Sequence, residues 1–590
     1  MKEFLKYTAA TVVGIIIFGT LLTAFGLMSV VGIMASDQAT TTIDDNSVMV
    51  LTLNGPIYDQ GRDDIIGRIT GDDTSTTGLN DMLAAIKKAK NNDKVKGIYI
   101  EAGALQTGYA TMQELRSALA DFRKSGKWIV AYGDTYSQGA YYVASVASKL
   151  YLNPKGMIDW HGLASQPMFY KDLLAKFGVR YQVVKVGTYK SATEVFTEDR
   201  MSDANRQQVS AFVGGTWRNI CEAVSKSRGV SVDSLNSYAD HLLQFADPAT
   251  LKRAKMVDGL LYADEMKAEI KKLMKLDADE NIPRLSVSDM LGTKEEKAKG
   301  DEIAVYYASG DIVQEEPSQS ILSSTSIVAQ TVCKDLESLM LDDDVKAVVI
   351  RVNSGGGDAY ASEQIWHQVN LLKQKKPVVI SMGDYAASGA YYMSAPATWI
   401  VAQPNTLTGS IGIFAAIPDA SGLITQKLGV KFDEVKTNRN STFGNLMARP
   451  FNSEELGYLQ AYVNRGYSLF RQRVADGRHI GTADVECIAQ GRVWLGADAL
   501  KIRLVDQLGG LDAAIAKAAK LAKMDKWYTE DYPAPPSITD QLLGAASHSS
   551  YLDDQLRTTL GELYTPYSLL KNLNHREALQ ARIPFLPNMR

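Results

Sequence analysis

Cysteine and histidine are scarce in this sequence, and their scarcity removes whole classes of chemistry. The 590 residues include three cysteines, Cys221, Cys333 and Cys487, which are odd in number and widely scattered. They imply no disulfide framework. No group of histidine, cysteine and aspartate has the spacing of a metal site. We therefore expect neither a metal nor another cofactor.

An excess of charge of either sign is also absent. The chain carries 63 basic and 67 acidic residues, a net charge of -4, so nothing favours nucleic acid as a partner. Hydrophobic residues make up 45% and charged residues 22% of the chain, as in ordinary globular proteins. The length allows several domains with sizeable cores.

One long uncharged segment, residues 7–35, lies close to the N-terminus. It exceeds the roughly 20 residues that cross a bilayer and the roughly 7–15 apolar residues of a cleaved signal peptide. Lys2 and Lys6 precede it, and three aspartates follow it. We expect a single-pass signal anchor in the inner (cytoplasmic) membrane, with a cytoplasmic N-terminus and the remainder on the exported, periplasmic side. A signal peptide that is removed is the alternative.

An internal repeat with an offset of about 250 residues organises the remaining chain. Residues 133–142, GDTYSQGAYY, align with residues 383–392, GDYAASGAYY. Upstream, residues 93–96 align with residues 343–346 at the same offset. Such a long period indicates a duplicated domain and not a short-period solenoid.

Each copy alternates short apolar strands with helical periodicity, which predicts an α/β fold with parallel sheets covered by helices. Helices are expected just after the glycine turns, at residues 139–149 and 389–397. The predicted division is a membrane anchor at 7–35, an N-terminal domain at 47–292, a C-terminal domain at 301–526 and a C-terminal extension at 527–590.

The two copies differ in a complementary way at two positions. Ser388 in the second copy aligns with Gln138 in the first, and Lys190 in the first aligns with Asn440 in the second. Each copy therefore holds one member of a possible pair and an amide in place of the other. The simplest interpretation is an ancestral domain with both residues, of which one complete pair survives per chain.

A serine and a lysine together can perform nucleophilic catalysis. A serine hydroxyl needs a base to take its proton, and a lysine is a base only when neutral. Because its ordinary pKa is about 10.4, the site must lower that pKa, and the apolar stretch before Lys190 would allow the necessary burial. We predict Ser388 as nucleophile and Lys190 as general base.

An oxyanion hole is predicted from glycines that follow the strand at 347–352. The run Asn353–Gly357 ends in three glycines, which let backbone N–H groups approach a developing oxyanion. Gly356 and Gly357 are the candidate donors, together with Gly389 after the serine. The first copy has no glycine at the aligned residues 105–107.

Each of these signals also has an ordinary structural explanation. A serine before a helix is usually an N-cap, a lysine is usually a solvated charge, and a glycine run after a strand is usually a turn. These explanations weaken because the three features occupy matched places and the other copy lacks them in a complementary way.

At these residues the sequence resembles the signal peptide peptidase A family, also called protease IV, in its long duplicated bacterial form. The motifs that carry the resemblance are residues 189–192 (YKSA), 353–357 (NSGGG), 386–389 (AASG) and 407–412 (LTGSIG). The family usually has proline where this chain has Gly355, which would loosen the loop.

The resemblance implies tandem ClpP/crotonase-like domains, built as spirals of ββα units behind the transmembrane helix. It implies a serine endopeptidase with a Ser/Lys dyad across two domains, in which Ser410 orients Lys190. It further implies a homotetramer that degrades hydrophobic signal peptides left in the membrane, and similar peptides.

Two other classes of function remain open at this point. A crotonase-type acyl-CoA enzyme would share the fold and the oxyanion hole without needing Ser388 or Lys190. A non-catalytic membrane scaffold would need neither residue. The sequence also leaves open whether Lys190 serves the serine of its own chain or that of a neighbouring chain.

Overall fold

The computed structural model describes residues 6–7, 14, 18, 41–61, 76, 78–293, 300–315, 326–534 and 580–582. Within these ranges, no helix is both long and apolar enough to cross a bilayer. The membrane segment predicted at residues 7–35 lies almost wholly outside them, so it stays a prediction.

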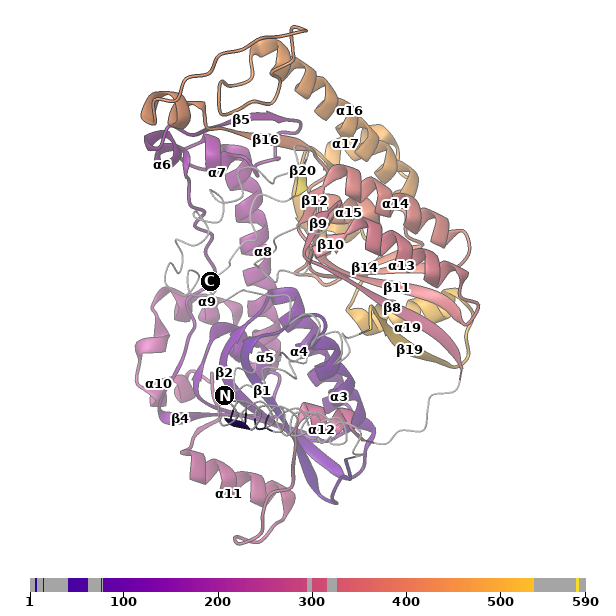
Figure 1. The fold of residues 1–590 in the computed structure, drawn as a ribbon. Helices are drawn as coiled ribbons and strands as arrows, with labels where there is room; N and C mark the ends of the chain where they lie inside the picture. The colour runs from indigo at the N-terminus through magenta and orange to yellow at the C-terminus, as the bar shows by residue number, and fades with distance from the viewer. Residues whose placement is uncertain are drawn as a thin grey trace.

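The first copy is built on a six-stranded sheet whose neighbouring strands all run parallel (Figure 1). The strand order is β6 (Gly259–Leu260), β4 (Lys149–Ile158), β3 (Trp128–Tyr136), β2 (Val95–Gln106), β1 (Ser47–Pro56) and β7 (Arg284–Leu285). One face packs against α3 (Leu79–Asn91), α4 (Tyr109–Arg123) and α5 (Gln138–Ala144), and the other against α11 (Ala263–Met274). Helices on both faces explain why these strands are apolar along most of their length.

The second copy repeats this plan. Its sheet has the order β17 (Val493–Leu495), β15 (Leu407–Gly409), β13 (Val378–Ala387), β11 (Val345–Ser354), β8 (Asp301–Ser309) and β19 (Trp527–Tyr532), with β14 (Trp399–Ala402) and β18 (Gln507–Leu508) beside β13. Helices α13 (Ala329–Leu341), α14 (Ala359–Lys373) and α15 (Gly389–Ser394) cover one face, and α19 (Leu511–Leu521) covers the other. The duplicated α/β architecture expected from the repeat is therefore present.

The predicted boundaries differ from the structure in two places. The helix expected at residues 139–149 ends at Ala144, because Lys149 already pairs with Val130 in the first sheet. Strand β19 falls in the segment assigned to a C-terminal extension, yet it pairs in parallel with β8 and completes the second sheet.

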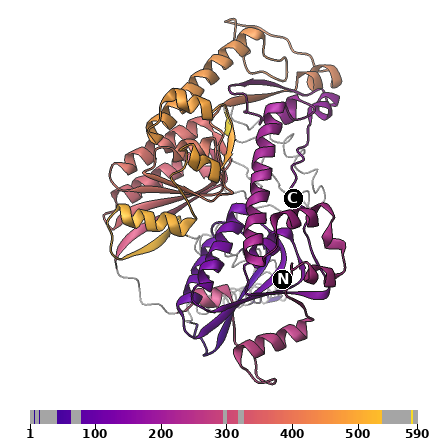
Figure 2. The ribbon, with the colours of Figure 1, turned by 180° about the vertical axis from the view of Figure 1, so that it is seen from behind.

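A third sheet joins the two copies. Its order is β10 (Ser326–Val328), β9 (Asp311–Val313), β12 (Gly356–Asp358), β20 (Gln580–Arg582), β16 (Phe414–Asp419) and β5 (Arg180–Lys185). Strand β5 belongs to the first copy and pairs antiparallel with β16 of the second. In Figures 1 and 2 the long helix α8 (Asp203–Arg228) runs from the first sheet towards this junction. The first copy thus extends an arm, residues 164–202, that reaches the second.

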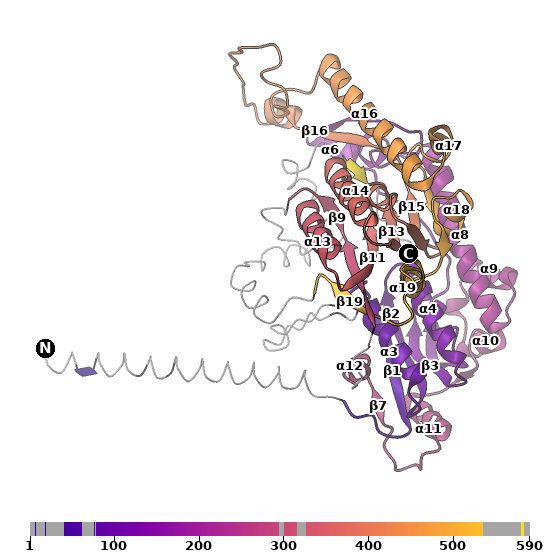
Figure 3. The same ribbon diagram turned by 90° about the vertical axis from the view of Figure 1, so that its right-hand side faces the viewer.

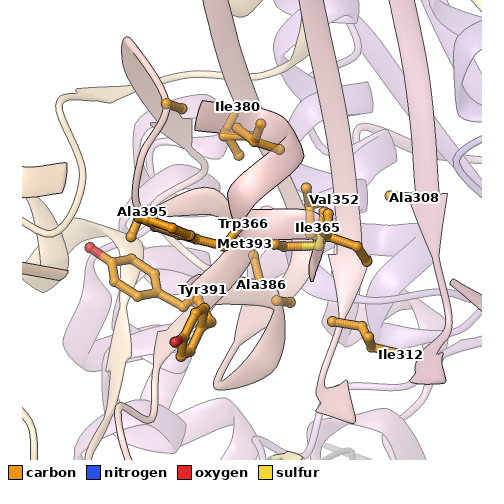
Figure 4. Close-up of a cluster of buried hydrophobic side chains, with 14 of the residues drawn as sticks. Ala308, Ile312, Val352, Ile365, Trp366, Ile380, Ala386, Tyr391, Met393 and Ala395 are labelled. Atoms are coloured by element: carbon orange, nitrogen blue, oxygen red, sulfur yellow. The ribbon is translucent and has the colours of Figure 1, made fainter. Parts of the chain in front are cut away.

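The core beneath the second copy's glycine turn is continuous and apolar. Figure 4 shows Val352 of β11 and Ile380 and Ala386 of β13 among side chains from α14 and α15. Tyr391 of α15 is fully buried, and its hydroxyl donates to the Leu504 carbonyl at 2.9 Å. Close packing on this scale fixes the position of the turn at residue 388.

Buried charges hold the copies together. Arg351 of β11 donates to Asp59 (2.7 Å) and Glu114 (3.0 Å) of the first copy, and all three side chains are almost fully buried. Burial opposes the charge of Arg351, but the two carboxylates outweigh it, and its pKa is raised. Asp59 also accepts from Asn353 at 2.6 Å. The strand that leads into the glycines is therefore tied to the other copy.

A second tie lies four residues before Ser388. The carboxylate of Asp384 accepts from the Ala110 and Thr111 N–H groups (2.8 and 3.0 Å) and from the Thr111 hydroxyl (2.6 Å). It satisfies N–H groups at the start of α4, whose own N-cap residue, Gly108, has no side chain to do so. Burial raises the pKa of Asp384, although the hydrogen bonds from Thr111 oppose that rise.

We expect Asp59→Ala to lower the free energy of unfolding by about 3–5 kcal/mol, since it leaves the buried Arg351 short of a carboxylate. The matched control is Glu454→Ala, which removes the partner of the exposed Arg439 and should cost about 1 kcal/mol or less. Urea denaturation followed by circular dichroism measures both. Equal losses would contradict a structural role for the buried ion pairs.

Candidate active site

Ser388 sits at the junction of β13 and α15, in an unusual backbone conformation. Its φ is +57° and its ψ is -114°, a combination that costs about 1–3 kcal/mol for a residue with a side chain. The Ser388 N–H donates to the Gly409 carbonyl at 2.8 Å. Its side chain makes no capping hydrogen bond to α15, so the ordinary explanation of Ser388 as an N-cap does not hold. In the first copy, Ser137 does cap α5, by accepting from the Ala140 N–H.

Lys190 of the first copy's arm meets Ser388 inside one chain. Lys190 Nζ lies 2.8 Å from Ser388 Oγ, 3.0 Å from Ser410 Oγ and 3.2 Å from the Ser410 carbonyl oxygen. All three residues are fully buried. The structure therefore brings together three of the predicted site residues, across 198 and 220 positions of sequence, and answers within one chain the question that the sequence left open.

The environment of Lys190 opposes its charge. Burial lowers its pKa well below the ordinary value. The atoms that face Nζ are two serine hydroxyls, a carbonyl oxygen and, 5.9 Å away, the ring of Phe414. No ion pair of Lys190 with a carboxylate exists among the described residues. A lysine in such surroundings can be neutral near physiological pH and so can accept a proton.

Two glycines of the second copy make room for the lysine stem. A Cβ at Gly491 would lie 2.6 Å from Lys190 Cβ, and a Cβ at Gly412 would lie 3.2 Å from Lys190 Cδ. Gly491 also has φ +76°, which favours glycine. Sequence reasoning quoted Gly412 within a motif but missed Gly491, because nothing in the local pattern marks it as a neighbour of Lys190.

The predicted oxyanion donors are placed differently from one another. Gly389 is the first residue of α15, in the turn whose N–H groups have no acceptor within the helix. Gly356 and Gly357 belong to β12 and not to an open loop, and the Gly356 N–H donates to Ser354 Oγ at 3.1 Å. Of the three glycines, Gly389 is therefore the one best placed beside Ser388.

Strand β20 lies next to these glycines. It pairs antiparallel with β12, matching Gly356 with Arg582 and Gly357 with Ala581, and antiparallel with β16, matching Phe414 with Gln580. It also contacts α15. A stretch of the chain's own backbone thus occupies the slot between the glycines and the ring that faces Lys190.

The aligned positions in the other copy are inert. Gln138 is buried and holds residues 161–162 through hydrogen bonds from the His161 and Gly162 N–H groups and to the Gly162 carbonyl. Asn440 is exposed on the segment 428–449. One serine–lysine pair per chain follows. Among the described residues, no group of histidine, cysteine and carboxylate side chains could hold a metal ion.

Comparison with known proteins agrees with this duplicated arrangement. The model of peptidase family S49 matches twice, at residues 121–277 and 370–525. These ranges include Lys190 in the first match and Ser388 and Ser410 in the second. The chain belongs to peptidase family S49, and it is a serine peptidase of the long, duplicated form.

Curated relatives share most of the chain's length. A protein named Protease 4 from Salmonella typhi is 37% identical over 81% of this chain and 78% of its own. Protease 4 from Haemophilus influenzae is 30% identical over 86% of this chain and 85% of its own. The chloroplastic serine protease SPPA of Arabidopsis thaliana is 30% identical over 88% and 76%.

Among solved structures, a ClpP1 variant from Listeria monocytogenes matches with a TM-score of 0.24 and 14% identity, covering 36% of this chain and 94% of its own. A TM-score this low supports no conclusion about the fold. The α/β class and the duplication rest on the sheets themselves, and the ClpP/crotonase-like spiral stays a prediction.

We expect Gly491→Ala to reduce peptidase activity at least about tenfold, because the new methyl group would displace Lys190 and a shift near 1 Å is costly in catalysis. Gly126→Ala is the control: its φ is +84° and nothing lies within 4 Å of the added Cβ. Both variants share the backbone strain, so comparable activities would contradict the packing of Gly491 on the lysine.

We expect the lowered pKa of Lys190 to appear in the stability of Lys190→Met. The unfolded wild type binds a proton below about pH 10.4 that the folded protein does not bind until a much lower pH. Wild-type stability therefore falls as the pH drops below that value, and the methionine variant lacks this loss. Differential scanning calorimetry should show the melting temperature of the variant gaining on wild type between pH 10 and pH 7. A constant difference would show that folding does not depress the pKa.

Proposed function

We propose that this chain is a membrane-anchored serine endopeptidase that uses a Ser/Lys dyad to degrade cleaved signal peptides and similar hydrophobic peptides. Ser388 is the nucleophile and Lys190 the general base. The observation that carries the proposal is the 2.8 Å contact between Lys190 Nζ and Ser388 Oγ in a fully buried setting.

The reaction proceeds through an acyl-enzyme. Neutral Lys190 takes the proton of Ser388 as Oγ attacks the peptide carbonyl carbon, and the Gly389 N–H stabilises the oxyanion. The C–N bond then breaks, and the lysine ammonium passes its proton to the leaving amine. A water molecule attacks the ester, Lys190 takes its proton, and the proton returns to Ser388 Oγ as the acid leaves. Ser410 keeps Lys190 aimed at Ser388 during both halves.

An extended peptide suits the slot beside the serine. Strands β12 and β16 flank β20 on either side, so the slot offers main-chain hydrogen bonds to a strand laid between them. Ile312 of β9, paired with Gly357, and Phe414 of β16 are both buried there. Substrate backbone would take the place of β20, and apolar side chains would find apolar surroundings.

The anchor and the assembly are parts of the same proposal. Residues 7–35 would hold the chain in the inner membrane with both copies on the periplasmic side, close to hydrophobic peptides left in the bilayer. Assembly into a homotetramer is supported by the second copy's arm, residues 428–449, which stands away from the sheets in Figure 3. Phe432, Val435 and Phe443 are exposed on it, and a neighbouring chain would cover them.

We expect a fluorophosphonate probe to label Ser388 in the wild type and not in Ser388→Ala. Labelling of Lys190→Met should be slower by about 10²–10⁴-fold, the usual contribution of a general base. Ser137→Ala, which changes the serine beside the vacant position of the first copy, should label like wild type. Peptide mapping by mass spectrometry locates the adduct.

Two outcomes would favour the other classes of function. A crotonase-type acyl-CoA enzyme would leave Ser388 unlabelled in the wild type. A non-catalytic scaffold would show the same residual peptide turnover in wild type, Ser388→Ala and Lys190→Ala.

A further inference from the structure

Gln208 is a buried amide that neither the motifs nor the proposed reaction uses. It lies on the first turns of α8, with 1% of its surface exposed. Its Nε2 donates to the Tyr189 carbonyl at 3.0 Å and the Ser191 hydroxyl at 2.9 Å, with Asn205 Oδ1 a third neighbour at 3.2 Å. The residues on both sides of Lys190 are thus held by one side chain.

The other end of the same amide reaches the second copy. Its Oε1 accepts from the Val493 N–H at 3.1 Å. Val493 begins β17 and pairs with Gly409 of β15, whose carbonyl accepts from the Ser388 N–H. A continuous path of hydrogen bonds therefore runs from the two neighbours of Lys190, through Gln208, to the backbone of Ser388.

We propose that Gln208 is the positioning residue that sets the distance between Lys190 and Ser388. An inference of this kind rests on the proposed function and adds to it a residue that touches neither substrate nor reacting atoms. The chemistry of the site requires an amide. Only an amide can donate to two acceptors of the first copy while accepting from an N–H of the second, and a glutamate would also place a charge beside the neutral lysine.

The internal repeat provides an independent argument. Helices α8 (Asp203–Arg228) and α16 (Ser453–Arg478) have the same length and begin 250 residues apart. Gln208 therefore aligns with Tyr458, which is 57% exposed and donates to Glu454 of its own helix. The copy that carries Lys190 has the clamp, and the copy that carries Asn440 does not. A residue needed only for the fold would be expected in both copies.

The test compares Gln208→Leu with Gln138→Leu. Leucine has a similar volume and no charge. Gln138 is also a buried amide that donates to a carbonyl and accepts from backbone N–H groups, but it lies at the inert position of the first copy. Both variants should lose thermal stability, because each leaves buried polar partners unsatisfied. The comparison separates catalysis from folding.

For Gln208→Leu we expect fluorophosphonate labelling of Ser388, and kcat for a hydrophobic peptide, to fall about 10–100-fold with little change in KM. The pH at half-maximal labelling should move upward, since a looser loop admits water to Lys190 and eases its protonation. Gln138→Leu should keep the wild-type rate and pH profile when assayed below its melting temperature.

If Gln208→Leu does not fold, Gln208→Asn serves instead, because it keeps an amide but withdraws it from its partners by about one carbon–carbon bond. Rates and pH profiles for Gln208 variants equal to those of Gln138→Leu would overturn the positioning role. Failure of wild-type Ser388 to label would overturn the proposed function itself, so the two failures are distinguishable.

Discussion

The contact between an amine and a hydroxyl in a place closed to water is the constraint on which the rest of this structure depends. Lys190 can act as a base only if its surroundings make the charged form unfavourable, and full burial against two serines and an aromatic ring does so. A lysine stem of that length must come from outside the domain that carries the serine turn. The seam between two copies supplies both the burial and the approach.

The other inter-copy contacts fit this requirement. Arg351 with Asp59 and Glu114, and Asp384 with the start of α4, fix one copy against the other beside the serine turn. Buried ions are weak evidence for stability in themselves, but here they connect the strands that lead to the glycines and to Ser388. Gln208 fixes the remaining coordinate, the position of the lysine loop. Duplication allowed each copy to specialise, one as the donor of the base and the other as the holder of the nucleophile.

Some of this was predictable from sequence, and the reason lies in the repeat. Ser388 and Lys190 stand out because Gln138 and Asn440 occupy the aligned positions, and the α/β order follows from short apolar runs. Ser410 entered only through family resemblance. Gly491 and Gln208 escaped, since their partners lie about 300 residues away and no local pattern links them. The hydrogen bond from Gly356 to Ser354 and the pairing of β12 with β20 were missed for the same reason.

The most direct test mixes two defective chains. Lys190→Met chains, which keep Ser388, are co-expressed with Ser388→Ala chains, which keep Lys190, and fluorophosphonate labelling of Ser388 is measured in the purified mixture. A site built within each chain predicts labelling no faster than that of Lys190→Met alone. Labelling that rises towards the wild-type rate in the mixture would contradict the account, because the lysine of one chain would then serve the serine of another.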